Sequence, residues 1–217
     1  MIAPVNDLAL ALGDDDLATL VAYGVTEHYP RGATIYMEGD DVRSLWWIRS
    51  GRVHIMKMAT TGAESLVAFF GAGQTFCAAA TLLARPFPCS GRAATEVEIV
   101  RIPSERFLEL VADLPDLAKR LLGELAPKIC DAHCDCARNL EKVDKRLAHT
   151  LLRLDGHFGG QAIPFTRQEL AQMVNTTVES CIRTLSAWTK HGWIEGGRGE
   201  VRVVDRAALD GVLVADS

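Results

Sequence analysis

Apolar residues between Thr166 and Trp188 recur at the three- and four-residue spacing of two short helices. Thr166 is predicted to cap the first helix, with Glu169 completing a capping box, and Thr177 is predicted to cap the second. Asn175 falls between the helices, where a left-handed residue is common and asparagine tolerates that conformation. The positions predicted to face inward are Leu170, Ala171, Met173, Val174, Cys181, Leu185 and Trp188. This pattern is typical of a helix-turn-helix and makes DNA-binding regulation the leading hypothesis.

A different pattern, of short β-branched and aromatic runs separated by glycine, fills residues 25–102. The runs cover residues 33–37, 44–48, 53–58, 65–70 and 96–102. Short strands with turn residues every roughly 8–12 positions are typical of an antiparallel roll or barrel. Another kind of all-β sandwich also fits this periodicity.

Helical patterns surround the β region. Residues 5–22 are predicted to be amphipathic and helical, residues 103–113 to form a short helix, and residues 115–144 to form a long one. Along the long helix, steps of four and three residues alternate in a heptad pattern, which predicts packing against a second copy in a homodimer. The positions of this seam are Leu122, Ala126, Ile129, His133, Cys136, Leu140 and Val143.

The C-terminal part is predicted to be a winged helix-turn-helix. A helix over residues 145–154 precedes the motif, and residues 192–204 follow it as two short strands around a glycine-rich turn. The predicted fold class is therefore α+β. It has a β-roll sensor domain over residues 1–114, a dimerisation helix over residues 115–144 and a DNA-binding domain over residues 145–217.

The charge of the chain is unevenly distributed. The 217 residues have a net charge of −5, but residues 1–137 hold 12 basic against 18 acidic side chains, and residues 138–206 hold 11 against 8. A basic end on an acidic protein favours site-directed DNA binding over indiscriminate backbone binding. No apolar run of membrane-spanning length and no signal-peptide pattern occurs, so a cytoplasmic protein without membrane contact is expected. No P-loop, nucleophile elbow or metalloprotease helix is present, so an enzyme is not expected.

Three groups of motifs carry a resemblance to a known family. They are Gly32-x-x-Ile35-x-x-x-Gly39-Asp40 with Ser50-Gly51, Asp144-x-Arg146-Leu-Ala-x-x-Leu-Leu152, and Thr166-Arg-Gln-Glu-Leu-Ala. With the order of roll, long helix and winged helix-turn-helix, they make the chain similar to bacterial transcription regulators of the Crp/Fnr superfamily over nearly its whole length. The resemblance implies a homodimer that binds double-stranded DNA at a palindromic operator, with half-sites one helical turn apart. It also implies RNA polymerase as a partner.

The resemblance further implies which side chains read DNA. In the family, Glu and Arg at the positions of Glu179 and Arg183 read a G·C pair, consistent with the donors and acceptors of these groups. Val178 and Ile182 share the predicted outer face. Relatives place Ser or Gly at the position of Ile182, whose apolar side chain could contact a thymine methyl group. The candidate phosphate contacts are Arg167, Gln168, Thr176, Thr177 and Arg198. The alternative is that Glu179 and Arg183 form only a helix-stabilising ion pair.

Family members that bind cyclic nucleotides use a Gly-Glu pair and an Arg-Ser/Thr-Ala run around the phosphate. The matching segments here are residues 76–80 and 86–90, with Ala78 at the glutamate position and Phe87 at the arginine position. Without that guanidinium, the negative charge of a buried phosphate would have no compensating positive charge, at a cost of several kcal/mol. Cyclic AMP is therefore not the expected effector.

An apolar, thiol-bearing effector pocket is expected instead, formed by Cys77, Ala78, Phe87 and Cys89. The Phe-Cys context of Cys77 resembles the haem thiolate position of the family's carbon monoxide sensor, although Ala79 replaces the histidine of that sensor. An apolar haem pocket also resembles the family's nitric oxide regulators. The alternative is that Cys77 and Cys89 are simply small buried residues.

A second candidate sensor is the group Cys130, His133, Cys134 and Cys136 on the long helix. The first three fall on one helix face, and Cys136 lies near the dimer seam. Soft ligands of this kind suit zinc, an iron–sulfur cluster or another thiophilic metal, and the thiols could also be redox-active. Packing is the alternative. The arrangement differs from the family's oxygen sensor, which has a cysteine at the place of Val100.

Taken together, the sequence predicts a homodimeric, sequence-specific transcriptional regulator. Its expected signal is redox, a metal, haem with a gas, or a small molecule rather than cyclic AMP. The competing hypothesis is a cofactor-binding or scaffold protein whose winged helix mediates protein contacts.

Overall fold

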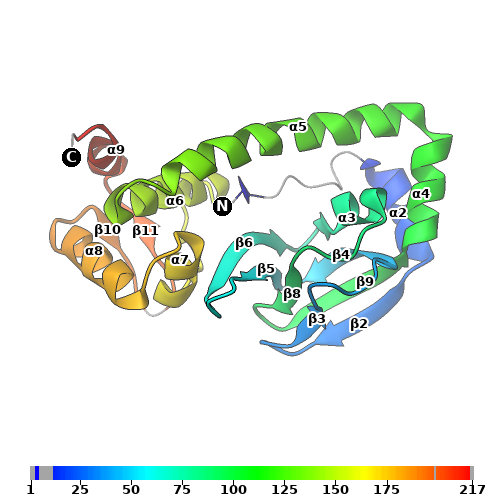
Figure 1. Cartoon of the computed structure of the whole chain (residues 1–217), viewed down its shortest axis with the longest axis horizontal. Coiled ribbons are helices and arrows are strands. Elements are labelled where there is room, and N and C mark those ends of the chain that lie inside the picture. Colours follow the sequence, from blue (N-terminus) through cyan, green and yellow to red (C-terminus); the bar gives the residue numbers. More distant parts are fainter. Residues whose placement is uncertain (1–2, 5–11, 198, 216–217) are drawn as a thin grey trace. The chain divides into compact units, whose positions relative to one another are not determined.

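The computed structural model describes residues 3–4, 12–197 and 199–215, without the side chains of residues 3, 4, 124 and 127–137. It divides into two compact units. Residues 5–131 form what we call the N-terminal unit, and residues 132–217 with residues 1–4 form the C-terminal unit. The main-chain trace of both is drawn in Figure 1.

The N-terminal unit contains two antiparallel sheets around one core (Figure 1). One sheet has the strand order β2-β9-β4-β7, and the other contains the order β6-β5-β8-β3. The strands are β2 (Val25–Tyr29), β3 (Thr34–Tyr36), β4 (Ser44–Ser50), β5 (Arg52–Met58), β6 (Glu64–Gly71), β7 (Thr75–Phe76), β8 (Ser90–Ala93) and β9 (Val97–Pro103). The β-roll prediction is confirmed. Strands β2, β7 and β8 were missed because they are short and lack a strong alternating pattern.

The tight turn between β4 and β5 explains the Ser50-Gly51 motif. Gly51 has a φ of 87°, a left-handed conformation that glycine adopts without strain. A Cβ at this position would also overlap the backbone carbonyl oxygen of Glu96. Only glycine fits both constraints.

Helices cover the outer side of the sheet that contains β4 and β9. They are α2 (Asp14–Ala22), α3 (Ala78–Leu83), α4 (Ser104–Asp113) and the first turns of α5 (Pro115–Arg138). The buried residues that join them to the sheet are Leu12, Leu20, Leu45, Ala78, Val100, Ile102, Phe107, Leu117 and Leu121. The helices predicted over residues 5–22 and 103–113 correspond to α2 and α4, while residues 5–11 lie outside the described part of the chain.

The long helix ends earlier than predicted. Helix α5 stops at Arg138, and Lys142 has an extended backbone before α6 (Val143–His157) begins. Leu140 lies in the intervening turn and is 91% exposed. The prediction of one helix to residue 144 was therefore wrong at its C-terminal end. The apolar residues keep their heptad spacing across the break, so periodicity did not reveal it. Leu140 and Val143 do not belong to α5.

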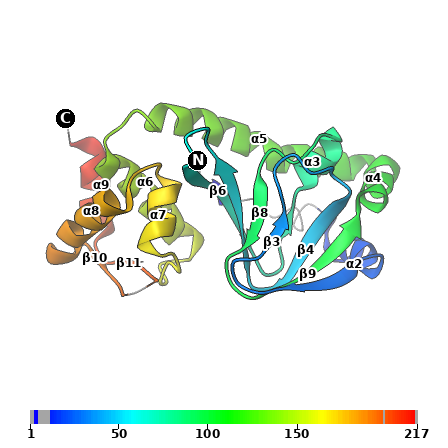
Figure 2. The ribbon, with the colours of Figure 1, turned by 60° about the horizontal axis from the view of Figure 1, so that its bottom comes forward.

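The C-terminal unit is a winged helix-turn-helix, as predicted. Figure 2 shows α7 (Arg167–Met173) and α8 (Val178–Lys190) with the antiparallel pair β10 (Ile194–Glu195) and β11 (Arg202–Val203). The unit also contains β1 (Ala3–Pro4) and α9 (Arg206–Val214), which the sequence reading missed. Arg206 of α9 forms an ion pair with the mostly buried Asp155 of α6 at 2.7 Å. None of the helices in the described part of the chain is long and apolar enough to span a membrane.

Candidate DNA-reading surface and sensor core

The two helices of the motif begin at the predicted caps. The Glu169 amide donates to Thr166 Oγ1 at 3.2 Å, and the Thr166 amide donates to Glu169 Oε2 at 2.6 Å. The Ser180 amide donates to Thr177 Oγ1 at 3.2 Å. Asn175 has a φ of 51°, the predicted left-handed turn residue. Local sequence therefore sets where both helices start.

The capping box gives a direct stability prediction. Thr166→Ala is expected to lower the free energy of unfolding by about 1 kcal/mol, because the Glu169 amide loses its acceptor. Thermal or urea unfolding of the two proteins measures the difference. The matched control is Thr189→Ala on an exposed face of α8, for which a change within about 0.5 kcal/mol is expected. Equal effects of the two substitutions would contradict the role of the cap.

Arg146 anchors the turn of the motif to α6, a role that the sequence reading missed. Its guanidinium donates to the backbone oxygen of Val174 and, at 3.3 Å, to that of Asn175. These carbonyls come at the end of α7, where the helix no longer supplies donors. The Arg146 of the Asp144-x-Arg146 motif therefore orients α7 and its turn. The partners of Arg146 lie 28 and 29 residues along the chain, so the motif alone does not reveal them.

Helix α8 has one buried and one exposed face. Cys181 and Leu185 are fully buried, and Trp188 is 5% exposed, as predicted. Glu179 and Arg183 lie on the exposed face. Arg183 Nη2 donates to Ser180 Oγ at a long 3.4 Å, and the described contacts include no ion pair between Arg183 and Glu179. The simple ion-pair alternative is therefore not observed, and both charged groups remain available.

The candidate phosphate contacts differ in exposure. Gln168 and Thr177 are exposed and Thr176 is half-buried, while Arg198 lies outside the described residues. Arg167 is half-buried, and its Nη1 is enclosed without a hydrogen-bond partner. Burial raises the pKa of the neighbouring Cys181 thiol to about 11, and the positive charge of Arg167 opposes this shift. Cys181 is thus a protonated packing residue.

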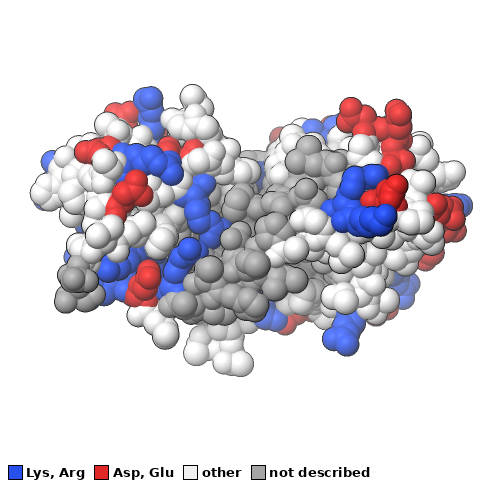
Figure 3. Space-filling view, turned by 90° about the horizontal axis from the view of Figure 1, so that it is seen from above, with Lys and Arg blue, Asp and Glu red and all other residues white. Residues whose placement is uncertain are grey.

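The face of the molecule drawn in Figure 3 shows how charge is distributed on the C-terminal unit. On this face, Lys and Arg side chains are interspersed with carboxylates.

The core between the two sheets is an aromatic cluster, defined as Tyr36, Trp46, Phe70, Phe76 and Phe87. The Tyr36 ring centroid lies 5.0 Å from that of Trp46 and 4.2 Å from that of Phe87. The centroids of Trp46 and Phe76 are 5.3 Å apart, and the rings are nearly parallel. A Cβ at Gly91 would overlap the Tyr36 ring, so this glycine makes room for the cluster. The indole nitrogen of Trp46 is buried without a partner.

Cys77 and Cys89 border this cluster. The Cys77 thiol donates to the Tyr36 hydroxyl at 3.0 Å, and burial raises the thiol pKa to about 12. Burial also raises the pKa of Tyr36, so both groups are neutral at pH 7. Burial raises the pKa of Cys89 as well, but the nearby Lys57 ammonium opposes the shift. Cys77 takes part in packing and hydrogen bonding, whereas Cys89 has a cationic neighbour.

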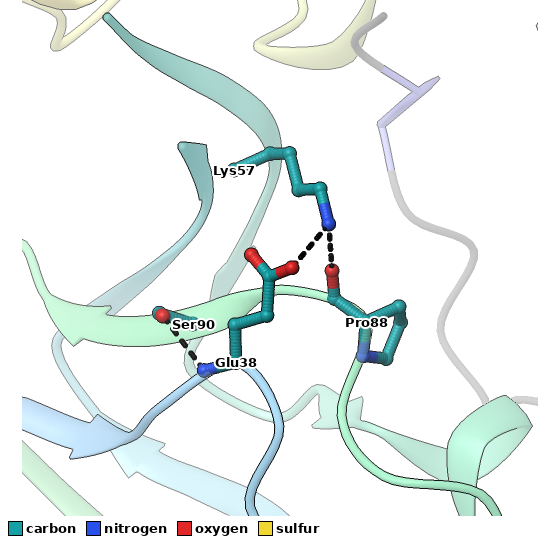
Figure 4. A network of polar contacts seen from close by, with 4 residues as sticks. All are labelled: Glu38, Lys57, Pro88 and Ser90. Atoms are coloured by element: carbon teal, nitrogen blue, oxygen red, sulfur yellow. Dashed lines mark hydrogen bonds and ion pairs between the residues drawn. The ribbon is translucent and has the colours of Figure 1, made fainter. Parts of the chain in front are cut away.

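The segment that contains Cys89 is held by a polar network (Figure 4). Lys57 Nζ donates to Glu38 Oε1 at 2.5 Å and to the Pro88 carbonyl oxygen at 2.8 Å. The Glu38 amide donates to Ser90 Oγ at 2.9 Å. The hydrogen bond to Glu38 raises the pKa of Lys57. The ammonium is therefore already paired with a carboxylate.

Comparison with known proteins identifies both units. A model of the cyclic nucleotide-binding domain matches residues 26–113, and a model of the Crp-like helix-turn-helix domain matches residues 145–212. The chain belongs to the Crp/Fnr family of transcription regulators. Members of this family act by binding DNA, not as enzymes.

Similar proteins align with most of the sequence of this Crp/Fnr regulator. The cyclic AMP receptor protein of Thermus thermophilus is 27% identical over 200 residues, which are 92% of this chain and 93% of that protein. A CRP-like cAMP-activated global transcriptional regulator of Mycobacterium tuberculosis is 29% identical over 189 residues, 83% of this chain and 84% of its own. The structure of FixK2 from Bradyrhizobium japonicum superposes with a TM-score of 0.77 at 17% identity, covering 89% of this chain and 99% of FixK2. This last likeness concerns the fold alone.

Ala78 and Phe87, which are predicted to occupy the glutamate and arginine positions of the family's cyclic-nucleotide binders, are both buried in this regulator. Ala78 is 8% exposed and packs in the helical core, and Phe87 is 3% exposed in the aromatic cluster. Cys77 and Cys89 pack against the cluster of Phe87, whereas Ala78 belongs to the other core, and an effector pocket formed by these four residues stays a prediction. Tyr36 and Trp46 were not predicted as part of this cluster, because the residues that they contact lie on strands and loops far along the chain.

The predicted metal or redox group lies on a part of α5 whose side chains are not described. Its backbone is helical, but the side chains of Cys130, His133, Cys134 and Cys136 lie outside the described set, as does that of Ile129. Among the side chains that are described, no three His, Cys, Asp or Glu residues come together as a metal site. The role of this group stays a prediction.

The described cysteines are expected to differ in reactivity. In the native protein at pH 8, iodoacetamide should modify Cys89 faster than Cys77 and Cys181, because the thiolate is the reacting form and the latter two have pKa values of about 12 and 11. Time-resolved mass spectrometry of the peptides measures the three rates, with urea-unfolded protein as the control in which they converge. Equal rates in the folded protein would contradict the raised pKa of the Cys77 thiol.

Proposed function

We propose that this Crp/Fnr regulator is a homodimer that reads a palindromic operator through α8 and responds to a signal other than cyclic AMP. The observation that carries the DNA-reading role is the exposed face of α8, where Glu179 and Arg183 are unpaired with each other. Arginine donates two hydrogen bonds to guanine and glutamate accepts one from cytosine, so four-residue spacing lets them address neighbouring bases. RNA polymerase is the partner through which such a regulator would act.

The N-terminal unit supports the second part of the proposal. At the two positions that hold a cyclic-nucleotide phosphate in the family, Ala78 and Phe87 offer no charge, and Phe87 is packed against Tyr36. Lys57, a cation bound to the neighbouring segment, is paired with Glu38. Burying a phosphate against Ala78 and Phe87, with no cation paired to it, would cost several kcal/mol. We therefore expect titration calorimetry with cyclic AMP to give no binding heat.

The candidate signals are oxidation, a metal, haem with a gas, or an apolar small molecule. The partly buried Cys77 thiol and the unpaired Trp46 nitrogen favour the aromatic cluster as a site for haem or an apolar small molecule. The cysteine-rich face of α5 favours the first two. Absorbance spectra and metal analysis of protein purified without oxygen distinguish them. A Soret band supports haem, and broad visible absorption with iron and sulfide supports a cluster. Colourless, metal-free protein leaves thiol oxidation or an apolar ligand.

Helix α5 supports the homodimer. Leu117 and Leu121 are buried in the N-terminal unit, whereas Leu122 is 67% exposed and Ala126 is exposed. An apolar seam on the other side of a long helix is expected to pack against a second helix. Light scattering should therefore give twice the mass of the chain.

The test of the main proposal is operator selection from random duplex DNA. We expect enrichment of an inverted repeat with half-sites about one helical turn apart, under at least one condition of reductant, metal or haem. Failure to enrich any sequence under all of them would favour the alternative, a scaffold whose winged helix binds protein.

A further inference from the structure

The C-terminal unit contains an open pocket that the proposed function does not use. Its volume is about 250 Å³. The residues that line it come from the start of α6, the end of α8, the segment before β10 and the end of α9: Lys142, Asp144, Lys145, Trp188, Trp193, Val212 and Ala215. All of them belong to this one unit, and none is among the predicted DNA contacts.

Hydrogen bonds and an ion pair hold the walls of the pocket in place. The Trp193 amide donates to the Trp188 carbonyl oxygen at 3.0 Å, and the Trp193 carbonyl oxygen accepts from the Asp205 amide at 3.0 Å. Asp205 in turn caps α9, because its side chain accepts from a backbone amide of the first turn at 2.9 Å. The ion pair between Arg206 and Asp155 connects α9 to α6. The pocket is therefore a built part of the folded unit.

Two indole rings form most of its apolar side. The ring centroids of Trp188 and Trp193 are 6.4 Å apart, and their planes are inclined by 34°. Val212 and Ala215 add aliphatic surface from α9. Aromatic and aliphatic walls with a few polar groups are typical of small-molecule sites. An apolar cavity of about 150 Å³ holds benzene, so this pocket has room for a group of one or two aromatic rings.

The polar side of the pocket has an excess of positive charge. Lys142 and Lys145 face one carboxylate, that of Asp144, whose Oδ1 accepts from the Lys145 amide at 2.8 Å. Neither lysine has an ion pair with another residue in the described part of the chain. The positive end of the α6 dipole lies at the same place and adds to the attraction for an anion. A ligand with an aromatic ring and one negative charge complements both sides.

We propose that this pocket binds a small aromatic carboxylate, with its ring against Trp188 and Trp193 and its carboxylate beside Lys142 and Lys145. The site is separate from the aromatic cluster of the N-terminal unit, and it depends neither on the signal proposed there nor on the DNA-reading role. It gives the C-terminal unit a ligand of its own. A ligand of about 13 non-hydrogen atoms in an open pocket of this size is expected to bind with a Kd on the order of 0.1–1 mM.

Fluorine NMR of the full chain labelled with 5-fluorotryptophan tests the site, with 1-naphthoate as the probe. The chain has four tryptophans, of which two line the pocket and two, Trp46 and Trp47, lie in the N-terminal unit. We expect the signals of Trp188 and Trp193, assigned with Trp188→Phe and Trp193→Phe, to shift until the site is saturated. Those of Trp46 and Trp47 should stay in place. A shift of Trp46 without the pocket signals would place the ligand in the N-terminal unit and overturn the inference.

Replacing the lysines tests the recognition of charge. Lys142→Gln and Lys145→Gln are each expected to weaken binding of 1-naphthoate by about two- to fivefold, the range of an exposed ion pair. The matched control is Lys190→Gln at the end of α8, because Lys190 is exposed and does not line the pocket. It should leave the affinity unchanged. Unchanged affinity when Lys142 and Lys145 are both replaced, or an equal loss in Lys190→Gln, would contradict the site.

Two further probes separate the ring from the charge. The neutral 1-naphthamide keeps the ring system, and inorganic phosphate keeps a negative charge without a ring. Both should bind more weakly than 1-naphthoate, and Val212→Phe, which fills the pocket, should abolish the shifts. Equal binding of 1-naphthamide would mean that the lysines recognise nothing, and equal binding of phosphate would reduce the pocket to a simple anion site. Either result, or no saturable shift of Trp188 and Trp193, would overturn the inference.

Discussion

Arg183→Ala is expected to reduce the preference for operator over unrelated DNA by about 5- to 150-fold, because one bidentate contact to guanine contributes about 1–3 kcal/mol of discrimination. Binding to unrelated DNA should change far less, since the candidate phosphate contacts elsewhere on the C-terminal unit are left unchanged. The measurement is a competition titration of operator against mutated duplex at fixed salt. Fixed salt matters because the electrostatic part of affinity falls steeply with ion concentration.

Two variants control for charge. Arg202→Ala removes the same charge from β11, where Arg202 is paired with Glu195 at 3.2 Å, and should leave the preference for operator unchanged. Arg183→Lys retains the charge but not the planar fork of donors, and should lose most of the preference. Unchanged discrimination in Arg183→Ala, or an equal loss in Arg202→Ala, would remove Arg183 from the reading role.

Phe87→Ala is expected to destabilise the N-terminal unit by about 3–5 kcal/mol without creating cyclic AMP binding. The ring is 3% exposed and contacts Tyr36 and Trp46, so truncation leaves a cavity inside the aromatic cluster. Urea unfolding with hydrogen exchange of peptides from residues 25–103 measures the loss in this unit alone. Calorimetry with cyclic AMP measures the second half of the prediction.

Leu83→Ala is the matched control, since Leu83 is 67% exposed on the neighbouring helix α3. Its effect should stay within about 0.5 kcal/mol. A loss below about 1 kcal/mol for Phe87→Ala would mean that the space around the ring is open rather than packed. Binding of cyclic AMP by either protein would contradict the proposed signal class.

Much of the DNA-reading surface was predictable from short-range pattern. The Thr166 and Thr177 caps, the Asn175 turn and the buried stripe of α8 each depend on residues at most a few positions apart. The hydrogen bonds and helical periodicity involved are local, so the sequence contains their full specification. The same holds for the long strands of the roll and for the wing.

The end of α5 shows where pattern reasoning fails. Heptad spacing continues through Leu140 and Val143, but the helix stops at Arg138. Periodicity reports only which positions are apolar, and the apolar positions keep their spacing across the break between α5 and α6. The short strands β2, β7 and β8 escaped detection for a related reason, because too few residues define their alternation.

The sequence alone was enough to establish the family, the order of the parts and the residues on the outer face of α8, because each follows from local periodicity and motif. The sensor core was decided only by tertiary structure. Tyr36 and Cys77 are 41 residues apart, and their hydrogen bond exists because separate strands bring them together. The packing of Phe87 against Tyr36 and Trp46 and the raised pKa of Cys77 likewise depend on burial between two sheets, and the exposed pair of Lys57 with Glu38 joins residues 19 positions apart. Burial and long-range contacts are properties of the folded chain, and no local spacing encodes them.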